Sequence, residues 1–362
     1  TQQRVKTDVN RVELMIAGRQ WGLVTLGLTL TLGVAIWGEM ILRLKFQDAC
    51  TRTDALLGLG LQPGASCQRQ SRDFKVTYQI NAWGLRDREI TEVKPAGGKR
   101  ILLLGDSFTE GTGVPLEATF GKQLEKLLNQ DGKIYSFEVI NAGVSGYSTL
   151  HEYLWLKEWG FKLQPDLVIL NVNETDLVEA AKYHQVWEEH DFGNLGPELN
   201  KSQIDRVLLL NLIRNQLASL RQQGGKPKTT VFIASAGTDE EAVKQYWQLV
   251  RSDIERINFF ARGKNVPLLV AWQPHGHQVS QAAWSEGRLT HGFMLGRMYP
   301  TEMPTLLNNL AQEVGFKFVD LSPAFKATDA ARLYFPYDGH WTAEGHRLVA
   351  ETLKEKVYDF LF

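Results

Sequence analysis

Short apolar runs alternate with longer amphipathic stretches from residue 100 to the end of the sequence. The runs that predict buried strands are ILLL at 101–104, EVIN at 138–141, DLVILNV at 166–172, TTVFIAS at 229–235, VPLLVAW at 266–272 and FKFVDL at 316–321. The stretches that predict helices lie near 117–130, 148–159, 239–262, 302–314 and 342–357. Strands that alternate with helices favour a parallel sheet with helices on both faces. We therefore expect a doubly wound, three-layer α/β/α domain over residues 98–362, with an insertion near 177–228 where the alternation is interrupted.

The longest apolar stretch lies near the start of the sequence. Residues 21–38 carry no charged side chain, and roughly 20 apolar residues are enough to cross a bilayer as a helix. Trp21 and Trp37 lie near its ends, where interfacial aromatic residues occur in membrane proteins. A buried core helix is the alternative, but the stretch is apolar on all sides rather than along one stripe. We expect residues 21–42 to form a transmembrane helix that anchors the chain in the lipid bilayer, and no small-residue cleavage site follows it.

Basic residues on the two sides of this segment indicate its orientation. Four precede it and three follow it within the short flanks, namely Arg4, Lys6, Arg11 and Arg19 against Arg43, Lys45 and Arg52. The excess predicts that residues 1–20 form a cytoplasmic tail and that the C-terminal domain lies outside the cytoplasm, in the periplasm.

Residues 43–97 predict a juxtamembrane region with short strands, in which DFKVTYQINAWGLRD alternates polar and apolar positions around a turn at 81–86. Cys50 and Cys67 both fall in this region. In an oxidising compartment they could form a disulfide, and two free thiols are the alternative.

Composition excludes one class of partner. Of the 362 residues, 43% are hydrophobic and 22% are charged, and the formal net charge is −1. A balanced chain of this kind has a sufficient core but no basic surface for nucleic acid. We expect no nucleic-acid partner.

Four polar motifs occur where the loops of a parallel sheet would meet. GDSFTEG at 105–111, NAGVSGYST at 141–149 and NVNETD at 171–176 each come at the end of a predicted strand, and PYDGHWTAEGH at 336–346 opens the last predicted helix. Ligands of doubly wound sheets bind at the carboxyl ends of the strands. A serine in a strand-to-helix turn suits a nucleophile, although Asp106 and Ser107 also fit a plain helix cap.

Together these motifs resemble the SGNH/GDSL hydrolase superfamily over about residues 78–360, and NAWGLRDREI is similar to a segment of its membrane-anchored bacterial members. The resemblance implies a flavodoxin-like fold in which Ser107 is the nucleophile, His340 the general base and Asp338 the residue that orients the histidine. The backbone N–H groups of Ser107 and Gly146 would then stabilise the oxyanion.

Two positions depart from the family pattern. The third block of the family usually ends in Gly-x-Asn-Asp or Gly-Asn-Asp, whereas this chain, aligned on Asp176, has Glu174 and Thr175 at the two positions before that aspartate. Asn173 or Thr175 could supply the missing oxyanion donor, or the oxyanion hole has one donor fewer. In addition, Asp338 precedes His340 by two positions instead of the usual three.

Other polar residues near the motifs fit structural roles. His346 falls inside the last predicted helix, and Glu110 is expected near the start of a helix. Arg86 and Glu89 are expected to be solvated charges in a turn. His275 and His277 could line the same mouth, but no complete set of metal ligands is visible. The tryptophans expected to pack in the core or on the surface are Trp155, Trp159, Trp187, Trp247 and Trp284.

These observations predict a membrane-anchored serine esterase or O-acyltransferase that needs no cofactor. Its substrates would be acyl esters of envelope glycans or lipids, and the reaction would pass through an acyl-enzyme. The alternative is a catalytically impaired domain that serves as a structural or binding subunit beside other membrane proteins, because fold alone does not decide function.

Overall fold

The computed structural model describes residues 29–38, 50–130, 135–189, 231–237 and 239–361. The described part of the chain forms two units, of which one is the segment 29–38 and the other contains all the remaining described residues. Residues 29–38 are helical, but no helix within the described ranges is long and apolar enough to cross a membrane. Most of the predicted span 21–42, and the predicted tail 1–20, lie outside the described residues.

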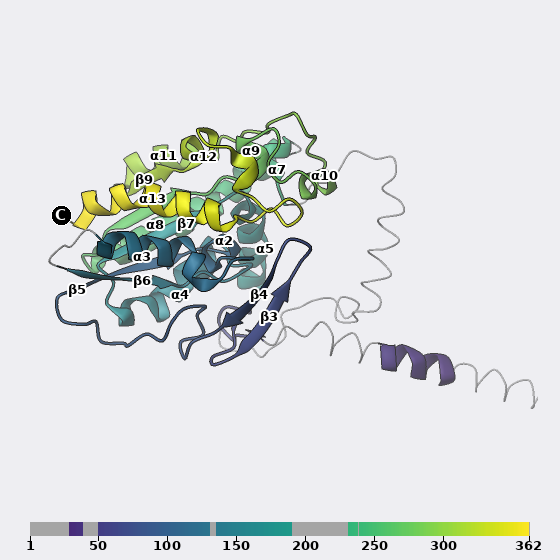
Figure 1. The fold of residues 1–362 in the computed structure, drawn as a ribbon, viewed down its shortest axis with the longest axis horizontal. Coiled ribbons are helices and arrows are strands. Elements are labelled where there is room, and N and C mark those ends of the chain that lie inside the picture. The colour runs from purple at the N-terminus through teal and green to yellow at the C-terminus, as the bar shows by residue number, and fades with distance from the viewer. Residues whose placement is uncertain (1–28, 39–49, 131–134, 190–230, 238, 362) are drawn as a thin grey trace, which may run out of the picture. The chain divides into compact units, whose positions relative to one another are not determined.

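A five-stranded parallel sheet forms the centre of the larger unit (Figure 1). Its strands are β5 (Gly98–Leu104), β6 (Ser136–Asn141), β7 (Leu167–Val172), β8 (Leu268–Trp272) and β9 (Lys317–Asp320). The strands lie in the order β6-β5-β7-β8-β9, with every neighbouring pair parallel. This is the strand order of flavodoxin-like folds. The predicted doubly wound fold is confirmed.

Helices cover both faces of this sheet. The long helices are α3 (Phe120–Gln130), α4 (Thr149–Glu158), α5 (Thr175–Glu189), α8 (Glu240–Gly263), α11 (Met303–Val314) and α13 (Ala343–Leu361). Short helical turns are α2 (Ser107–Glu110), α7 (Ile233–Ala236), α9 (Gly276–Val279), α10 (Gly287–Thr290), α12 (Ser322–Lys326), η1 (Leu116–Ala118), η2 (Gly160–Leu163) and η3 (Ala330–Arg332). These elements form the two outer layers of the α/β/α domain.

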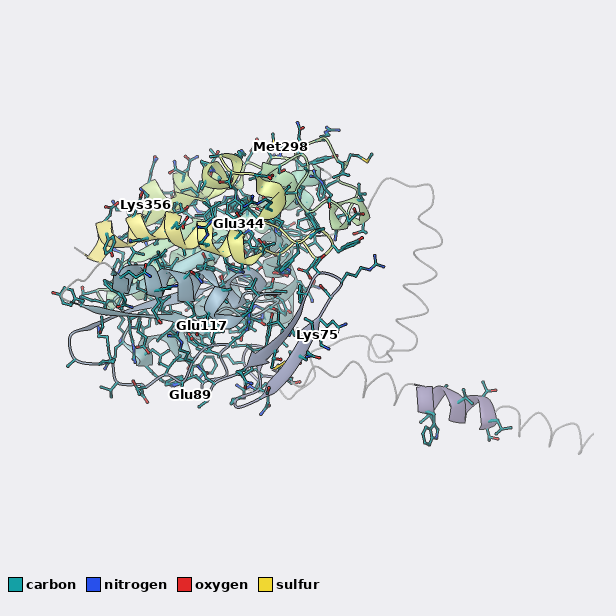
Figure 2. The ribbon with its side chains drawn as sticks, viewed as in Figure 1. Lys75, Glu89, Glu117, Met298, Glu344 and Lys356 are labelled. Carbon is teal, nitrogen blue, oxygen red and sulfur yellow. A yellow bond between two sulfur atoms is a disulfide. The ribbon has the colours of Figure 1, made fainter. Side chains whose placement is uncertain are left out.

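Successive residues of the strands point to opposite faces of the sheet. In β5, Leu102 and Leu104 belong to the core that includes residues of α4, α8 and α11, whereas Ile101 and Leu103 belong to the core that includes α3 and α13. A strand directs successive side chains to opposite faces, so a run of consecutive leucines is what a strand buried on both faces requires. On the outer side of the α3 and α13 layer, Glu117 in η1 and Lys356 in α13 are exposed (Figure 2).

One predicted strand is wrong. Of the run TTVFIAS at 229–235, the described part contains the short helix α7 instead of a strand. The Glu174 carboxylate accepts hydrogen bonds from both the backbone N–H and the hydroxyl of Ser235, which favours a helical turn there. Phe232 packs against Trp284 and Phe293 in a separate apolar cluster. Of the apolar residues that suggested a strand, Val231 and Phe232 therefore pack in this cluster, whereas Ile233 joins the core on one face of the sheet from within a helical turn.

The predicted insertion is described only at its beginning. Residues 177–189 continue α5, which packs on α8, and positions 190–230 lie outside the described residues.

The region before the sheet forms two small antiparallel pairs. They are β1 (Thr51–Arg52) with β2 (Gly60–Leu61), and β3 (Ser66–Gln70) with β4 (Lys75–Gln79). A disulfide joins Cys50 to Cys67 in β3, with a Cα–Cα distance of 5.7 Å. Of the two alternatives for the cysteines, the structure therefore supports the pair.

Removing the disulfide should destabilise this region. The bridge spans 17 positions of sequence, for which loop-closure entropy predicts a stabilisation of about 3 kcal/mol. Chemical denaturation of Cys50→Ala/Cys67→Ala should show a free energy of unfolding lower by about 2–4 kcal/mol. A reducing agent should lower the value for the native chain in the same way and leave the variant unchanged. Equal stability of the two chains would contradict this expectation.

Candidate functional site

Ser107 lies in the first turn of α2, just beyond the carboxyl end of β5. The Asp106 carboxylate caps this turn by accepting the Phe108 backbone N–H over 2.9 Å. Gly105 has a φ of +154°, and a Cβ atom there would lie 2.1 Å from Thr109 Oγ1. Glycine alone tolerates both conditions. The Gly-Asp-Ser sequence thus produces the tight turn that presents Ser107 at the edge of the sheet.

The loop before α13 brings two further polar residues to Ser107. His340 Nε2 lies 2.7 Å from Ser107 Oγ, and Asp338 Oδ1 lies 2.5 Å from His340 Nδ1. With the Nδ1–H donating to Asp338, the Nε2 atom is free to accept the Ser107 hydroxyl proton. The Phe108 ring packs on the imidazole at a centroid distance of 4.7 Å. The short Asp-x-His spacing therefore permits a continuous Ser–His–Asp chain of hydrogen bonds.

The electrostatics of Asp338 favour its ionised form. Partial burial acts to raise the pKa of this carboxyl, but the hydrogen bond from His340 and the charge of His340 outweigh burial. The pKa of Asp338 consequently lies below its ordinary value. An ionised carboxylate at this position can hold the imidazole in one tautomer and stabilise its protonated form.

The loop after β6 lies against the Ser107 turn. Its Val144 N–H donates to the Gly105 carbonyl over 3.1 Å, and the Glu110 carboxylate accepts the Ser145 N–H over 2.5 Å. Gly146 follows with a φ of +85°. Neither the Gly146 nor the Ser107 backbone N–H donates a hydrogen bond to another described residue. Two backbone donors in adjacent loops are thus available for a negatively charged oxygen.

Asn173 and Thr175 take different positions at the end of β7. Asn173 Nδ2 donates to Asp106 Oδ2 over 2.7 Å, directly beside the serine. The side-chain oxygen of Asn173, Oδ1, accepts the Thr175 N–H at 2.8 Å and the Thr175 hydroxyl at 2.9 Å. The amide group of Asn173 therefore faces the Ser107 turn, whereas the Thr175 hydroxyl is engaged with Asn173.

His275 also contacts this site. Its partner is Asn173, which the sequence did not indicate. Its Nε2 lies 3.2 Å from the side-chain Oδ1 of Asn173. Its ring meets the Phe108 ring edge-on, with 5.2 Å between the ring centroids. Burial, and then the neighbouring His277, lower the pKa of His275 to about 3. A neutral His275 that donates to Asn173 fixes which end of the amide points to Asp106. Neither histidine belongs to a group of three or more candidate ligands that could hold a metal ion within the described residues.

Arg86 is buried instead of exposed as expected. The Arg86 side chain is buried and donates to the carbonyl oxygens of Glu110, Gly111 and Val114. Glu110 is also buried, and its carboxylate accepts a hydrogen bond from the Ser145 backbone N–H. These contacts join the region before the sheet to the segment that follows Ser107, so the solvated role expected for Arg86 is wrong, whereas Glu110 lies in the short helix α2 as expected.

The other expected structural residues are placed as follows. Glu89 accepts the Ala82 N–H at the surface. His346 is buried inside α13, where its Nδ1 accepts the Phe120 N–H at the start of α3. Among the tryptophans, Trp155, Trp247 and Trp284 are buried.

Buried carboxyl groups lie below the site. Burial is the main cause that raises the pKa of Asp106, Glu152, Asp176 and Glu179, and the carboxylates reinforce one another. The pKa of Glu179 is raised to about 8. At neutral pH, Glu179 therefore holds a proton that it would lose in the unfolded chain.

This proton uptake predicts a pH dependence of stability. Between about pH 4.5 and 8, Glu179 stays protonated in the folded chain but ionises on unfolding, so the free energy of unfolding should fall as pH rises. Each such group contributes a slope of at most about 1.4 kcal/mol per pH unit. Denaturation curves at several pH values should show a shallower decline for Glu179→Gln than for the native chain. Glu158→Gln, an exposed change on α4, is the control, and parallel declines for all three chains would contradict the expectation.

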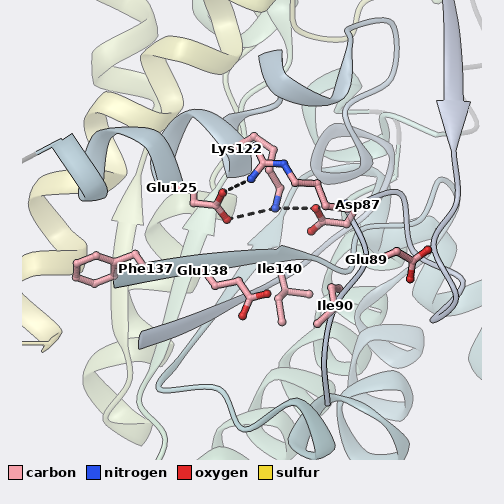
Figure 3. Close-up of a pocket in the computed structure, with 9 residues that line it drawn as sticks. Asp87, Glu89, Ile90, Lys122, Glu125, Phe137, Glu138 and Ile140 are labelled. Atoms are coloured by element: carbon pink, nitrogen blue, oxygen red, sulfur yellow. Dashed lines mark hydrogen bonds and ion pairs between the residues drawn. The ribbon is translucent and has the colours of Figure 1, made fainter. Parts of the chain in front are cut away.

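A separate cavity of about 140 Å³ lies between residues 87–90, α3 and β6 (Figure 3). Within it, Lys122 Nζ forms a 2.6 Å ion pair with Asp87 and also donates to the Val139 carbonyl oxygen. The Asp87 carboxylate accepts the Asn141 N–H as well. Because the Lys122 and Asp87 charges satisfy each other and the backbone, this network serves to tie the three segments together.

Comparison with known proteins gives one family match. The model of the GDSL-like lipase/acylhydrolase family matches residues 103–348, about two thirds of the chain. No curated protein matches the chain in sequence.

Solved structures with similarity to the chain include three esterases. The acetyl xylan esterase AlAXEase has 18% identity and a TM-score of 0.41, with 71% of this chain and 99% of that chain covered. A putative arylesterase from Agrobacterium tumefaciens has 20% identity and a TM-score of 0.39, with coverages of 73% and 100%. A variant of Axe2, an acetyl-xylooligosaccharide esterase from Geobacillus, has 15% identity and a TM-score of 0.42, with coverages of 72% and 94%.

Proposed function

Because the chain belongs to the GDSL-like lipase/acylhydrolase family and is thus a carboxylic ester hydrolase in the general sense, we propose that it cleaves acyl esters through an acyl–Ser107 intermediate. The hydrogen-bonded chain from Ser107 through His340 to Asp338 is the observation that carries this proposal. A domain that had lost catalysis would have no need to keep these three side chains in register. We therefore favour an enzyme over an impaired binding subunit.

Each residue has a role in the proposed reaction. His340 Nε2 takes the Ser107 proton while the serine oxygen attacks the ester carbonyl, and the protonated imidazole returns the proton to the departing alcohol. The backbone N–H groups of Ser107 and Gly146 and the side-chain amide of Asn173 bind the oxyanion of the tetrahedral intermediate. Water, activated by the same histidine, then attacks the acyl-serine and releases the acid.

Hydrolysis is favoured over transfer by the exposure of the site. The side chains of His340 and Asp338 are 22% and 20% exposed, so water has access to the acyl-enzyme. An O-acyltransferase would need a site from which water is excluded until the acceptor hydroxyl arrives.

We propose acyl esters of envelope glycans or lipids as substrates and the periplasmic side of the cell membrane as the location. The Cys50–Cys67 disulfide suits an oxidising compartment. The uncharged stretch 21–38 suits an anchor in the bilayer, which would place the enzyme close to envelope polymers and lipids.

Fluorophosphonate labelling with intact-mass readout tests the proposed nucleophile. The native chain should gain one adduct that Ser107→Ala does not, and Ser322→Ala, a change at the start of α12, should label like the native chain. Acetylated glycans then separate the two reactions, because hydrolysis releases free acetate whereas transfer yields an acetylated acceptor. A well-folded native chain that neither labels nor cleaves p-nitrophenyl acetate would refute the enzymatic proposal.

A further inference from the structure

The tip of the β3–β4 hairpin contacts the loop that carries Asp338, the candidate residue that orients His340. Hairpin residues 71–74 lie before the family match, which begins at residue 103, yet they contact residues 335–338 directly. Figure 1 shows this tip beside the loop that leads into α13. The hairpin is therefore placed to influence the site, although it lies outside the residues that the family model matches.

Asp73 makes the central contact. Its Oδ2 atom accepts the backbone N–H of Tyr337 over 3.0 Å and that of Asp338 over 2.7 Å. Hydrogen bonds to a charged acceptor are stronger than those between neutral groups. One carboxylate thus holds the backbone on which the Asp338 side chain is mounted.

The residues on both sides of Asp73 reinforce this contact. The Arg72 guanidinium lies over the Tyr337 ring at 5.0 Å, and the Phe74 ring packs against Phe335 at 5.3 Å. In the turn itself, the Ser71 hydroxyl accepts the Asp73 N–H over 3.0 Å. Asp73 is thus held on a fixed turn.

The opposite side of the loop is also held. The Trp284 indole N–H donates to the Tyr337 carbonyl oxygen over 3.1 Å, and the Gly287 N–H donates to the Pro336 carbonyl oxygen over 3.0 Å. The loop is clamped between the hairpin and the Trp284–Gly287 segment. Removing one side of a clamp frees the loop to shift, and a shift of about 1 Å is enough to reduce catalysis greatly.

We propose that Asp73 is a positioning residue, which acts through Asp338 to align His340 with Ser107. This inference rests on the proposed function, because it assigns Asp73 to the same triad. The hairpin is attached at its other end by the Cys50–Cys67 disulfide. The juxtamembrane region therefore contributes a part of the active site.

Two substitutions at Asp73 separate its roles. Asp73→Ala removes the acceptor for both N–H groups, whereas Asp73→Asn keeps a side-chain oxygen that can accept them. With p-nitrophenyl acetate and the full chain in detergent, Asp73→Ala should lower kcat by about 10–100-fold with little change in KM. Asp73→Asn should stay within about threefold of the native chain, since the geometry of the loop is preserved.

Controls exclude a general loss of structure. Lys75→Ala alters an exposed residue of the same hairpin (Figure 2), and Asp239→Ala removes a carboxylate that accepts a backbone N–H at the start of α8. Both should keep the native kcat, and thermal denaturation should show that Asp73→Ala is folded at the assay temperature. A native kcat in Asp73→Ala, a change confined to KM, or equal losses in Asp73→Ala and Asp73→Asn would overturn the proposal.

A measurement without turnover distinguishes failure of this inference from failure of the proposed function. The proton between His340 Nδ1 and Asp338 should give a downfield proton NMR resonance that is absent from Asp338→Ala. Asp73→Ala should shift or lose this resonance, and Asp73→Asn should retain it. If the native chain proves inactive, an unchanged resonance in Asp73→Ala still refutes the positioning role, and a lost one still supports it.

Discussion

Ser107→Ala should lower kcat/KM for p-nitrophenyl acetate by at least about 10⁴-fold, because the substitution removes the atom that becomes acylated. In the native chain, Ser107 Oγ lies 2.7 Å from His340 Nε2. Alanine leaves the backbone N–H groups of residues 107 and 146 in place. The residual rate should therefore come from oxyanion stabilisation and binding alone.

His340→Ala should cause a loss of similar size, and the double substitution should be no worse than either single one. Residues that act as a unit show this non-additivity, because the nucleophile is useless without its base. Stopped-flow or spectrophotometric assays of the three variants measure the comparison. If Ser107→Ala retained more than about a tenth of the native rate, another nucleophile would have to be sought, whereas additive losses would show that the two residues do not cooperate.

The fold followed from features that are local in sequence. Consecutive apolar residues such as those of β5 are needed where a strand is buried on both faces, and the glycine of Gly-Asp-Ser is needed where the turn is too tight for a Cβ atom. Both requirements act within a few residues. The strand predicted at 229–235 is wrong because Phe232 packs in a separate aromatic cluster with Trp284 and Phe293, and Ile233 reaches the main core from a helical turn.

The site could be predicted only as far as its motifs are local. Ser107 and His340 occur in recognisable blocks, whereas the contact of Asp73 with Asp338 joins residues 265 positions apart. The charge of Arg86 suggested solvent exposure, but three carbonyl groups of a later segment satisfy its guanidinium in the interior. Such partners are determined by how distant loops meet, and no spacing within one segment encodes them.

In the third motif, NVNETD at 171–176, the choice of the oxyanion donor also depends on a contact between distant residues. Alignment on Asp176 placed Thr175 at the family's asparagine position and Glu174 one position before it, and left Asn173 and Thr175 as alternatives for the oxyanion donor. Asn173 bonds to Asp106 across 67 positions of sequence, a contact that distinguishes the two side chains. The Glu174 carboxylate instead accepts hydrogen bonds from Ser235 and Gln278.

Asn173→Ala should therefore lower kcat by about 10²–10³-fold, equivalent to about 2.7–4 kcal/mol of transition-state stabilisation. Its side-chain amide donates to Asp106 beside the nucleophile and has a second N–H to offer the oxyanion. Because that interaction forms only as charge develops on the substrate oxygen, kcat and kcat/KM should fall together while KM stays nearly constant. Steady-state kinetics with a small ester measure both parameters.

Thr175→Val is the matched control for this prediction, because it removes the other candidate donor from the same turn. The Thr175 hydroxyl donates to the side-chain Oδ1 of Asn173. Its loss should therefore leave the Asn173 side chain less firmly positioned and lower kcat by no more than about tenfold. Equal stability of the two variants in thermal denaturation would exclude unfolding as the cause. If Thr175→Val caused the larger loss and Asn173→Ala kept a native kcat, the oxyanion donor would be Thr175. Native rates in both variants would instead indicate a hole formed by the backbone N–H groups of Ser107 and Gly146 alone, and the side chain of Asn173 would then serve only to cap Asp106.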